Sequence, residues 1–320
     1  MTGLIGRRPR PSGIDRSEFG ARYGLFAVLG AIVLVNVLIT PNFATLRNLE
    51  LTLIQVVFVM LVGVGMTLVI ATGGIDLSVG AVMGLTSVVA FSLLDQGPVV
   101  VVVACLLAGL AVGLLNGALI ASFNVQPILI TLGSLIWVRG LAQAISDGRK
   151  EYFDDPAMHF MGLGRIAGVP FQVIVTLIIV VVVAFVVTRT VFGRQLVATG
   201  GNRSAATLAG VPIKRTLIAS YAVCGTLAGL AGVFITARVG STDPTNFGVL
   251  IELDAIAAVV VGGTALAGGR ANVLGTVIGA IVLQLVTAAM IMNNVDFQLS
   301  LIVKAVIILV AVYLQRVASR

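Results

Sequence analysis

One carboxylate lies in a long apolar stretch of the chain, within the segment ATGGIDLSVGAVMGL at residues 71–85. Gly73 and Gly74 accept left-handed backbone angles, so the segment predicts a turn between two apolar helices. Asp76 can then accept the free amide protons of the second helix. An aspartate well inside a bilayer is unfavourable by about 2.5 to 3.5 kcal/mol. If the turn dips into the membrane, Asp76 must therefore also face a partner or a wet cavity.

Amide side chains interrupt two further apolar runs. Asn116 lies in GLLNG, inside a predicted helix, and Asn124 and Gln126 lie in NVQP, at a break before the helix that Pro127 opens. A buried amide can join two membrane helices, at about 0.6 kcal/mol for each hydrogen bond. Asn116 is also a candidate for lining a path across the membrane, and the sequence leaves both interpretations open.

A guanidinium interrupts the helix that follows Pro127. A buried Arg139 is at least as unfavourable as a buried aspartate, so its side chain either extends to the outer surface or pairs with an acid. The candidate partners are Glu252 and Asp254, which start another apolar helix on the same outer side. Such a pair would brace an outer mouth, whereas Lys304 is expected to extend toward the membrane surface.

A basic loop at residues 188–215 contains a short predicted helix, in the segment TGGNRSAATLAGVPIKR. The helix runs over residues 203–209 and starts at Arg203. Its other features are an asparagine cap, a small flat face of alanines and a glycine-proline stop, formed by Asn202, Ala205, Ala206, Gly210 and Pro212. Such a helix can rest on lipid headgroups or dock in a groove of a soluble protein, and its chemistry alone does not decide.

The composition identifies the class of protein that must position these residues. Hydrophobic residues make up 58% and charged residues 10% of the chain, and the mean hydropathy is +1.12. A soluble domain is roughly half apolar and a quarter charged, so this is an integral membrane protein. No G-x4-G-K-[ST] loop is present to bind nucleotide. Cys105 and Cys224 lie in apolar runs without metal-ligand spacing and are interpreted as packing residues. We therefore expect no enzymatic activity and no cofactor.

A helix needs about 20 apolar residues to cross the roughly 30 Å core of a membrane. About ten such windows occur, beginning near Tyr23, Leu51, Leu77, Pro98, Pro127, Pro170, Thr216, Leu250, Val273 and Phe297. The prediction is an all-α, polytopic helical bundle of about ten transmembrane helices. Its transmembrane domain covers residues 23–315, between a basic tail at 1–22 and a short tail at 316–320.

The charged loops predict the orientation of the chain. The tail at 1–22 carries five arginines against two acids, and the loop at 188–215 carries five basic residues and no acid. Both are predicted to be cytoplasmic, and the carboxyl terminus falls on the same side. Acids gather in the opposite loops. The net charge of +7 reflects this asymmetry and attraction to anionic membrane lipid, so a nucleic-acid partner is not expected.

The glycine pattern of the turn occurs twice. GGIDLSVGAVMG at residues 73–84 and GGRANVLGTVIG at residues 268–279 both fit G-G-x5-G-x3-G, and each lies between two apolar runs. A duplicated membrane unit is a fair inference, although a chain with 37 glycines also produces such matches by chance. Glycines at helical spacing predict seams at which two helix backbones approach closely; they are Gly109, Gly113 and Gly117, and then Gly225, Gly229 and Gly232.

Four segments together resemble one protein family, the permease subunit of ribose-type monosaccharide importers driven by an ATPase. They are VGMTLVIATGGIDLSVGAVMG, GLLNGALIASFNVQPILITLGSLIWVRG, GRQLVATGGNRSAATLAGVPIKR and IELDAIAAVVVGGTALAGGRANVLGTVIGA. The resemblance runs from about residue 45 to residue 315, and the arginine-rich tail departs from it.

The resemblance implies a homodimeric pore in the bacterial cytoplasmic membrane. An extracytoplasmic sugar-binding protein would supply a monosaccharide, and a separate cytoplasmic ATPase would drive its import. The family's signature turn corresponds to Gly73, Gly74, Asp76 and Ser78, and a second pattern contains Asn116, Gln126, Pro127 and Thr131. The helix that couples the permease to the ATPase would span Gly201 to Pro212.

Two other functions stay open at this point. A branched-chain amino-acid permease of a related group would share the ten-helix plan, although GGIDLSVG favours a sugar. A carrier coupled to an ion gradient would normally hold acids well inside its membrane helices, whereas Asp76, Glu252 and Asp254 all lie at predicted helix ends.

Overall fold

The computed structural model describes residues 16–318, and the side chains of residues 26–296, 298–307 and 309 within them. The tail at 1–22 and Arg316 to Arg320 therefore lie largely outside the described residues. The elements in chain order are α1 (Arg16–Ile39), α2 (Leu46–Ala71), α3 (Val79–Ser92), the 3-10 helix η1 (Leu94–Gln96), α4 (Pro98–Phe123), α5 (Pro127–Ile145), α6 (Pro156–Leu163), β1 (Arg165–Ile166), β2 (Val169–Pro170), α7 (Phe171–Arg189), α8 (Val191–Gly201), α9 (Arg203–Leu208), α10 (Ile213–Val239), α11 (Ile251–Val261), α12 (Val273–Met292) and α13 (Phe297–Ala318).

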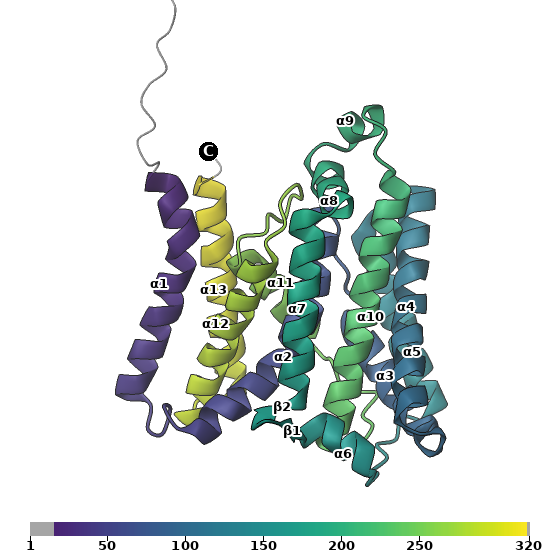
Figure 1. Cartoon of the computed structure of the whole chain (residues 1–320), viewed down its shortest axis with the longest axis vertical. Helices are drawn as coiled ribbons and strands as arrows, with labels where there is room; N and C mark the ends of the chain where they lie inside the picture. The colour runs from purple at the N-terminus through teal and green to yellow at the C-terminus, as the bar shows by residue number, and fades with distance from the viewer. Residues whose placement is uncertain (1–15, 319–320) are drawn as a thin grey trace, which may run out of the picture.

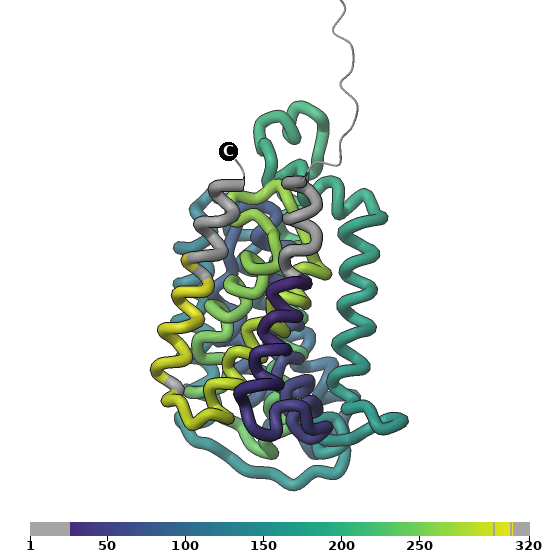
Figure 2. The backbone as a smooth tube through the Cα atoms, turned by 90° about the vertical axis from the view of Figure 1, so that its left-hand side faces the viewer, coloured from purple at the N-terminus to yellow at the C-terminus, as the bar shows by residue number. Residues whose placement is uncertain are grey.

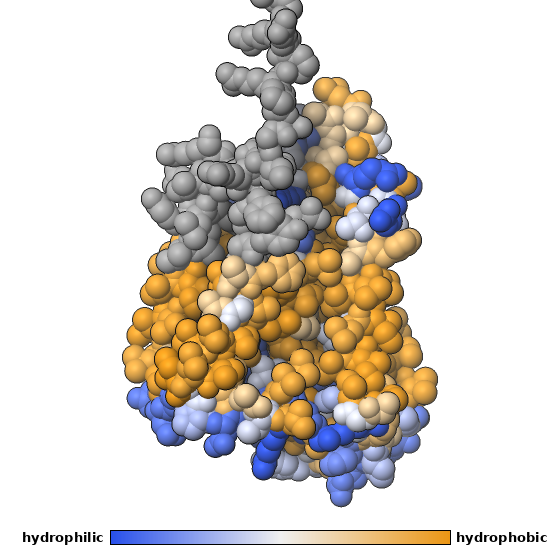
Figure 3. Space-filling view, turned by 60° about the vertical axis from the view of Figure 1, so that its left-hand side comes forward, coloured by the Kyte–Doolittle hydropathy of each residue, from blue (hydrophilic) through white to orange (hydrophobic). Residues whose placement is uncertain are grey.

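The helices stand side by side in a bundle with two distinct ends. The start of α1, the end of α13 and the projecting helix α9 lie at one end, and α6 with the β1–β2 hairpin lies at the other (Figure 1). The loop that carries α9 stands clear of the bundle when the molecule is turned (Figure 2). A broad apolar band runs across the visible face, and polar residues gather at the end that holds α6 (Figure 3). This distribution is that of a membrane protein.

Six of the described helices are long and apolar enough to cross a membrane: α2, α4, α5, α7, α10 and α12. Helices α3 and α11 occupy two further predicted windows but have only 14 and 11 residues. The sequence expectation of a full span at each of these two windows was therefore wrong. A helix of 14 residues rises about 21 Å, which is short of the apolar core of a bilayer.

Both short helices stop short of a full crossing, and a turn joins each of them to a long neighbour. The first turn leads from α2 to the short α3, and the second leads from the short α11 to α12. Gly73 and Gly268 hold the same place in the repeated pattern and share a φ of +85°, which favours glycine. The two turns touch, because the amide of Gly269 donates to the carbonyl oxygen of Ala71 at 2.9 Å.

The core lies around α2 and α10, which are the most buried of the six long helices. Helix α4 packs against α10 along the predicted glycine seam. A Cβ atom at Gly109 would overlap the carbonyl oxygen of Gly225, and one at Gly113 would overlap that of Tyr221. The close approach of these two backbones confirms the prediction made from the glycine spacing.

Candidate functional site

The turn between α2 and α3 places Asp76 inside the bundle, whereas Gly73 of the same turn is exposed. Asp76 is completely buried, and its Oδ1 accepts hydrogen bonds from the backbone amide and the hydroxyl of Ser78, at 3.0 and 2.6 Å. The residue that precedes α3 is Ser78 itself, and its side chain makes no capping bond. The prediction that Asp76 caps the next helix was therefore wrong in detail, because its one amide donor belongs to Ser78, which lies before the first helical residue.

Asp76 starts a chain of buried hydrogen bonds that we call the polar hub. The hydroxyl of Ser78 accepts from Asn116 Nδ2 on α4 at 2.9 Å. Asn116 Oδ1 accepts from the hydroxyl of Ser134 on α5 at 2.5 Å, and that hydroxyl accepts from the Trp137 indole at 3.2 Å. The hub therefore joins the turn to two long helices. Its bonds from Asp76 to Ser134 are buried, whereas the Trp137 indole is partly exposed.

A second contact joins the same turn to α5. The hydroxyl of Thr131 donates to the carbonyl oxygen of Ile75 at 3.2 Å, and Thr131 is fully buried. The predicted site residues Asp76, Ser78, Asn116 and Thr131 therefore meet in one place. Gln126 does not join them, because it is exposed at the start of α5 and makes no capping bond.

Helix α10 closes the other side of the hub. The Tyr221 hydroxyl and the Cys224 thiol, both buried, are electrostatic neighbours of Asp76. A Cβ atom at Gly74 would overlap the Tyr221 hydroxyl, so the second glycine of the turn makes room for this ring. Within the described residues, Asp76 Oδ2 and the Tyr221 hydroxyl have no hydrogen-bond partner.

The sequence did not single out four members of this site: Ser134, Trp137, Tyr221 and Cys224. Cys224 was interpreted as a packing residue, which agrees with its burial but misses its proximity to Asp76. Only the helical spacing of Ser134 from Thr131, three residues earlier, could have pointed to a shared face.

Arg139 binds backbone carbonyl groups. One guanidinium nitrogen donates to the carbonyl oxygens of Pro244 and Phe247, at 2.8 and 2.7 Å, in the loop before α11. Glu252 is only an electrostatic neighbour, and no ion pair within 4.0 Å joins it to Arg139. The predicted acid partner was wrong, because carbonyl oxygens of a folded loop bind the guanidinium. The extension of the side chain toward the outer surface stays a prediction.

Asp254 pairs with Lys304 of α13. The Lys304 ammonium lies 2.9 and 3.0 Å from the two carboxylate oxygens, and Lys304 is buried. The prediction that Lys304 extends to the membrane surface was therefore wrong. The pair ties the first turn of α11 to α13, where each charge offsets the burial of the other.

Four glycines bring the two turns against the end of α8, and we call this contact the glycine junction: Gly73, Gly200, Gly268 and Gly269. A Cβ atom at Gly200 would overlap the carbonyl oxygen of Ala71 and lie 2.6 Å from the Gly269 nitrogen. One at Gly268 would lie 2.9 Å from the Gly73 nitrogen and 3.0 Å from the Gly200 carbonyl oxygen. Three backbone segments therefore meet directly at Gly200, two residues before Asn202, the cap of α9.

Helix α9 has the predicted cap and stop. Asn202 Oδ1 accepts from the amide of Ala205 at 2.9 Å, and Gly210 has a φ of +76°. The predicted alanine face was wrong at Ala206, which is buried against Ala121, Ile213 and Leu217 at the root of the loop, whereas Ala205 is exposed. The outward-facing apolar group is Leu208, the last residue of the helix, which is 91% exposed.

These features together describe a multi-pass membrane permease. Long apolar helices surround two turns, α2–α3 and α11–α12, at each of which a long helix joins a short one. A capped helix projects from one end of the bundle, on the loop that touches both turns. The chain belongs to the family described as "Branched-chain amino acid transport system / permease component", whose model matches residues 48–312.

Several relatives are similar over nearly the whole chain. The ribose import permease protein of Escherichia coli (strain K12) is 40% identical over 294 residues, which cover 90% of this chain and 91% of that protein. The ribose import permease protein of Bacillus subtilis (strain 168) is 35% identical, over 93% of this chain and 94% of the relative. A D-allose transport system permease protein of E. coli (strain K12) is 33% identical, over 94% of both chains. These similarities confirm the resemblance to ribose-type permeases, and no solved structure matches the chain.

Proposed function

We propose that this chain is the permease subunit of an ATP-driven importer, which passes a monosaccharide across the bacterial cytoplasmic membrane. The observation that carries the proposal is the 40% identity to a ribose import permease, spread over 90% of the chain. Relatives whose names specify ribose and allose favour a sugar over the branched-chain amino acid in the family's description. The proposed partners are a cytoplasmic ATPase subunit, an extracytoplasmic sugar-binding protein and a second copy of the permease.

The ATPase docks on α9 in this proposal. Helix α9 projects from the bundle end at which α1 begins and α13 ends, and we assign that end to the cytoplasm (Figure 1). Leu208 gives the helix one exposed apolar side chain among polar and small neighbours. A single apolar anchor that fills a pocket in a partner is a common energetic centre of a protein interface.

Replacing Leu208 with aspartate should weaken ATPase docking and sugar import while leaving the fold intact. The change places a charge where the partner expects an apolar anchor, and its effect should be about 2 kcal/mol or more. The measurement is co-purification of the ATPase, with ATP hydrolysis stimulated by sugar-loaded binding protein in the reconstituted complex. Leu208→Met is the matched control and should retain both. Normal stimulation in Leu208→Asp would place the docking surface elsewhere, and no sugar stimulation in the wild-type complex would contradict the transport proposal itself.

Opposite ends of the bundle should label from opposite sides of the membrane. Both native cysteines are buried, so an introduced cysteine reports its own position. Lys150→Cys, in the loop after α5, should react with a membrane-impermeant maleimide in intact spheroplasts. Ser204→Cys, in α9, should react only after the membrane is opened. The reverse pattern would invert the proposed orientation.

The glycine junction gives the proposed ATPase a direct route to the centre of the bundle. Movement of α9 would displace the end of α8, and Gly200 transmits this to both turns because backbone touches backbone there. The polar hub then carries the displacement of the first turn to α4 and α5 through Asn116, Ser134 and Thr131. Small shifts pass through such contacts because close-packed interiors resist compression.

The remaining predicted residues take positions at the two ends of the proposed path. Arg139, through the loop before α11, and Asp254, through Lys304, brace the outer mouth. Glu252 lies beside them, and a Cβ atom at Gly80 would lie 2.7 Å from its carboxylate. Gln126 lies at the exposed α4–α5 break, on the end that we assign to the cytoplasm.

A further inference from the structure

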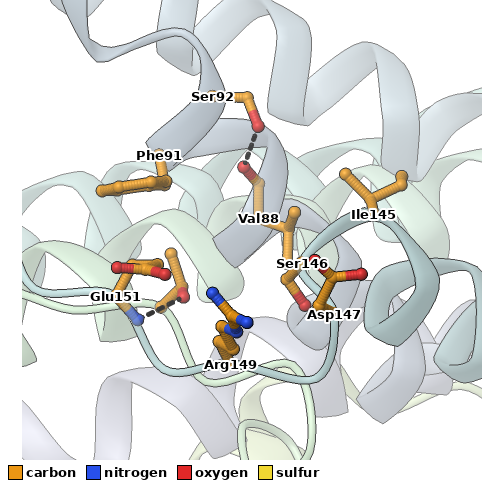
Figure 4. Close-up of a pocket in the computed structure, with 9 residues that line it drawn as sticks. Val88, Phe91, Ser92, Ile145, Ser146, Asp147, Arg149 and Glu151 are labelled. Atoms are coloured by element: carbon orange, nitrogen blue, oxygen red, sulfur yellow. Dashed lines mark hydrogen bonds between the residues drawn. The ribbon is translucent and has the colours of Figure 1, made fainter.

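A cavity of about 220 Å³ opens near the end of the bundle opposite α9 (Figure 4). Its lining comes from the end of α3, the end of α5 and the loop that follows α5, and it includes Phe91, Ser92, Ser146, Asp147, Arg149 and Glu151. Aromatic, hydroxyl, carboxylate and guanidinium groups therefore surround one small space. A cavity for a drug-sized ligand measures about 300 to 1,000 Å³, so this one suits a single small ring.

The wall of the cavity is held in place by backbone contacts. The amide of Thr242 donates to the carbonyl oxygen of Glu151 at 2.8 Å, and the amide of Glu151 donates to the Thr242 hydroxyl at 3.2 Å. A β-bridge pairs Tyr152 with Ser241 directly beside them. These bonds fix the backbone at Glu151, and the amide of Arg149 donates to the carbonyl oxygen of Ser146 at 2.9 Å, so the backbone of this wall is pre-formed.

The charged side chains of the cavity take part in no hydrogen bond or ion pair among the residues that the structure describes. The Arg149 guanidinium stands between Glu151 on one side and Asp147 on the other (Figure 4). Within the described residues the ion pairs are Arg165 with Glu50 and Lys304 with Asp254, so Arg149, Asp147 and Glu151 take part in none. Five N–H donors and two carboxylates thus stay available to a ligand.

We propose that this cavity is a weak binding subsite for one monosaccharide ring at the outer mouth, before the membrane is crossed. The proposal rests on the proposed function, which makes this end extracytoplasmic. A sugar presents donors and acceptors around its whole edge, and the cavity places both kinds of group on several walls. The Phe91 ring offers an apolar surface for the C–H face of a sugar. Charge-assisted hydrogen bonds to Arg149 and the carboxylates supply the affinity.

Saturation-transfer NMR on the full-length permease in nanodiscs, without ATPase or binding protein, tests the subsite. The probes are D-ribose, D-allose and L-arabinose, with L-leucine and empty nanodiscs as references. Wild type should transfer saturation to the ring protons of the aldoses. Arg149→Ala and Glu151→Gln should each weaken binding by about tenfold, since each loses a charge-assisted hydrogen bond. The matched control is Lys150→Ala, because Lys150 lies over the Tyr152 ring and outside the cavity lining.

Three results would overturn the subsite. They are the lack of any aldose signal in wild type, equal aldose signals in wild type and Arg149→Ala, or a stronger signal from leucine than from any aldose. If Arg149→Ala instead loses the binding protein while its aldose signal is unchanged, the cavity is a docking surface. The reconstituted importer separates this outcome from a failure of the proposed function. Sugar-stimulated ATP hydrolysis in wild type preserves the transport assignment even when the NMR signal is absent.

Discussion

Replacing Gly200 with alanine is expected to abolish sugar import and to destabilise the permease, whereas the same change one residue later is expected to be silent. A methyl group at Gly200 would overlap the carbonyl oxygen of Ala71 and press on the amide of Gly269, both of which are backbone atoms in packed turns. A methyl group at Gly201 would meet only the Gly269 Cα, at 3.7 Å, which is ordinary contact. Overpacking of this kind costs about 1 to 3 kcal/mol.

The two glycines form a matched pair because both are helical residues at the end of α8. Replacing glycine with alanine favours the helix by about 1 kcal/mol at either position. A difference in stability between the two variants therefore reports the contacts of the glycine junction alone. The measurements are thermal unfolding of the purified permease and sugar uptake with coexpressed partners. Equal behaviour of Gly200→Ala and Gly201→Ala would contradict the proposed route from α9 to the turns. A Gly200→Ala variant that unfolds normally and binds the ATPase but imports no sugar would be its strongest support.

Replacing Asn116 with leucine is expected to destabilise the bundle, because it removes both bonds at the centre of the polar hub. Ser78 would lose a donor, and Ser134 would lose its acceptor in a space closed to water. Each stranded buried group costs about 1 to 3 kcal/mol. The measurement is the thermal unfolding of the purified permease. Gln126→Leu is the control, since Gln126 is exposed and makes no capping bond.

A double variant makes this prediction sharper. Ser134→Ala removes the stranded hydroxyl, so Asn116→Leu with Ser134→Ala should be less destabilised than the sum of the single changes. Strict additivity would contradict a direct bond between the two side chains. If Asn116→Leu unfolds as wild type does but raises the KM for uptake, Asn116 lines the sugar path instead of joining the helices.

Much of the site was predictable because local chemistry determined it. The capped helix with its glycine stop was foreseen from Asn202 and Gly210, since caps and left-handed stops depend on a few neighbouring residues. The glycine seam between α4 and α10 was predictable for a similar reason, as a spacing of four fixes a helix face. The turn at Gly73 also followed from its residue types.

The partners of the charged residues were not predictable from the sequence. Arg139 finds the carbonyl oxygens of Pro244 and Phe247, more than 100 positions away, and Asp254 finds Lys304 on the last helix. A sequence lists the charges but not which loop folds beneath them, and backbone carbonyl groups occur at every position. The burial of Ala206 and the exposure of Leu208 depend in the same way on how the α9 loop lies on its root.

The sequence by itself determined the membrane class, the positions of the helices and the family, because hydropathy and local motifs are properties of short segments. Only the tertiary structure decided that α3 and α11 are too short to span, that their turns touch, and that α8 ends against both. Continuous hydropathy conceals a break inside a buried helix, since both sides of the break are equally apolar. Asp76 is tolerated there because the neighbouring Ser78 donates to it, and because packing brings the distant Asn116 of α4 to Ser78.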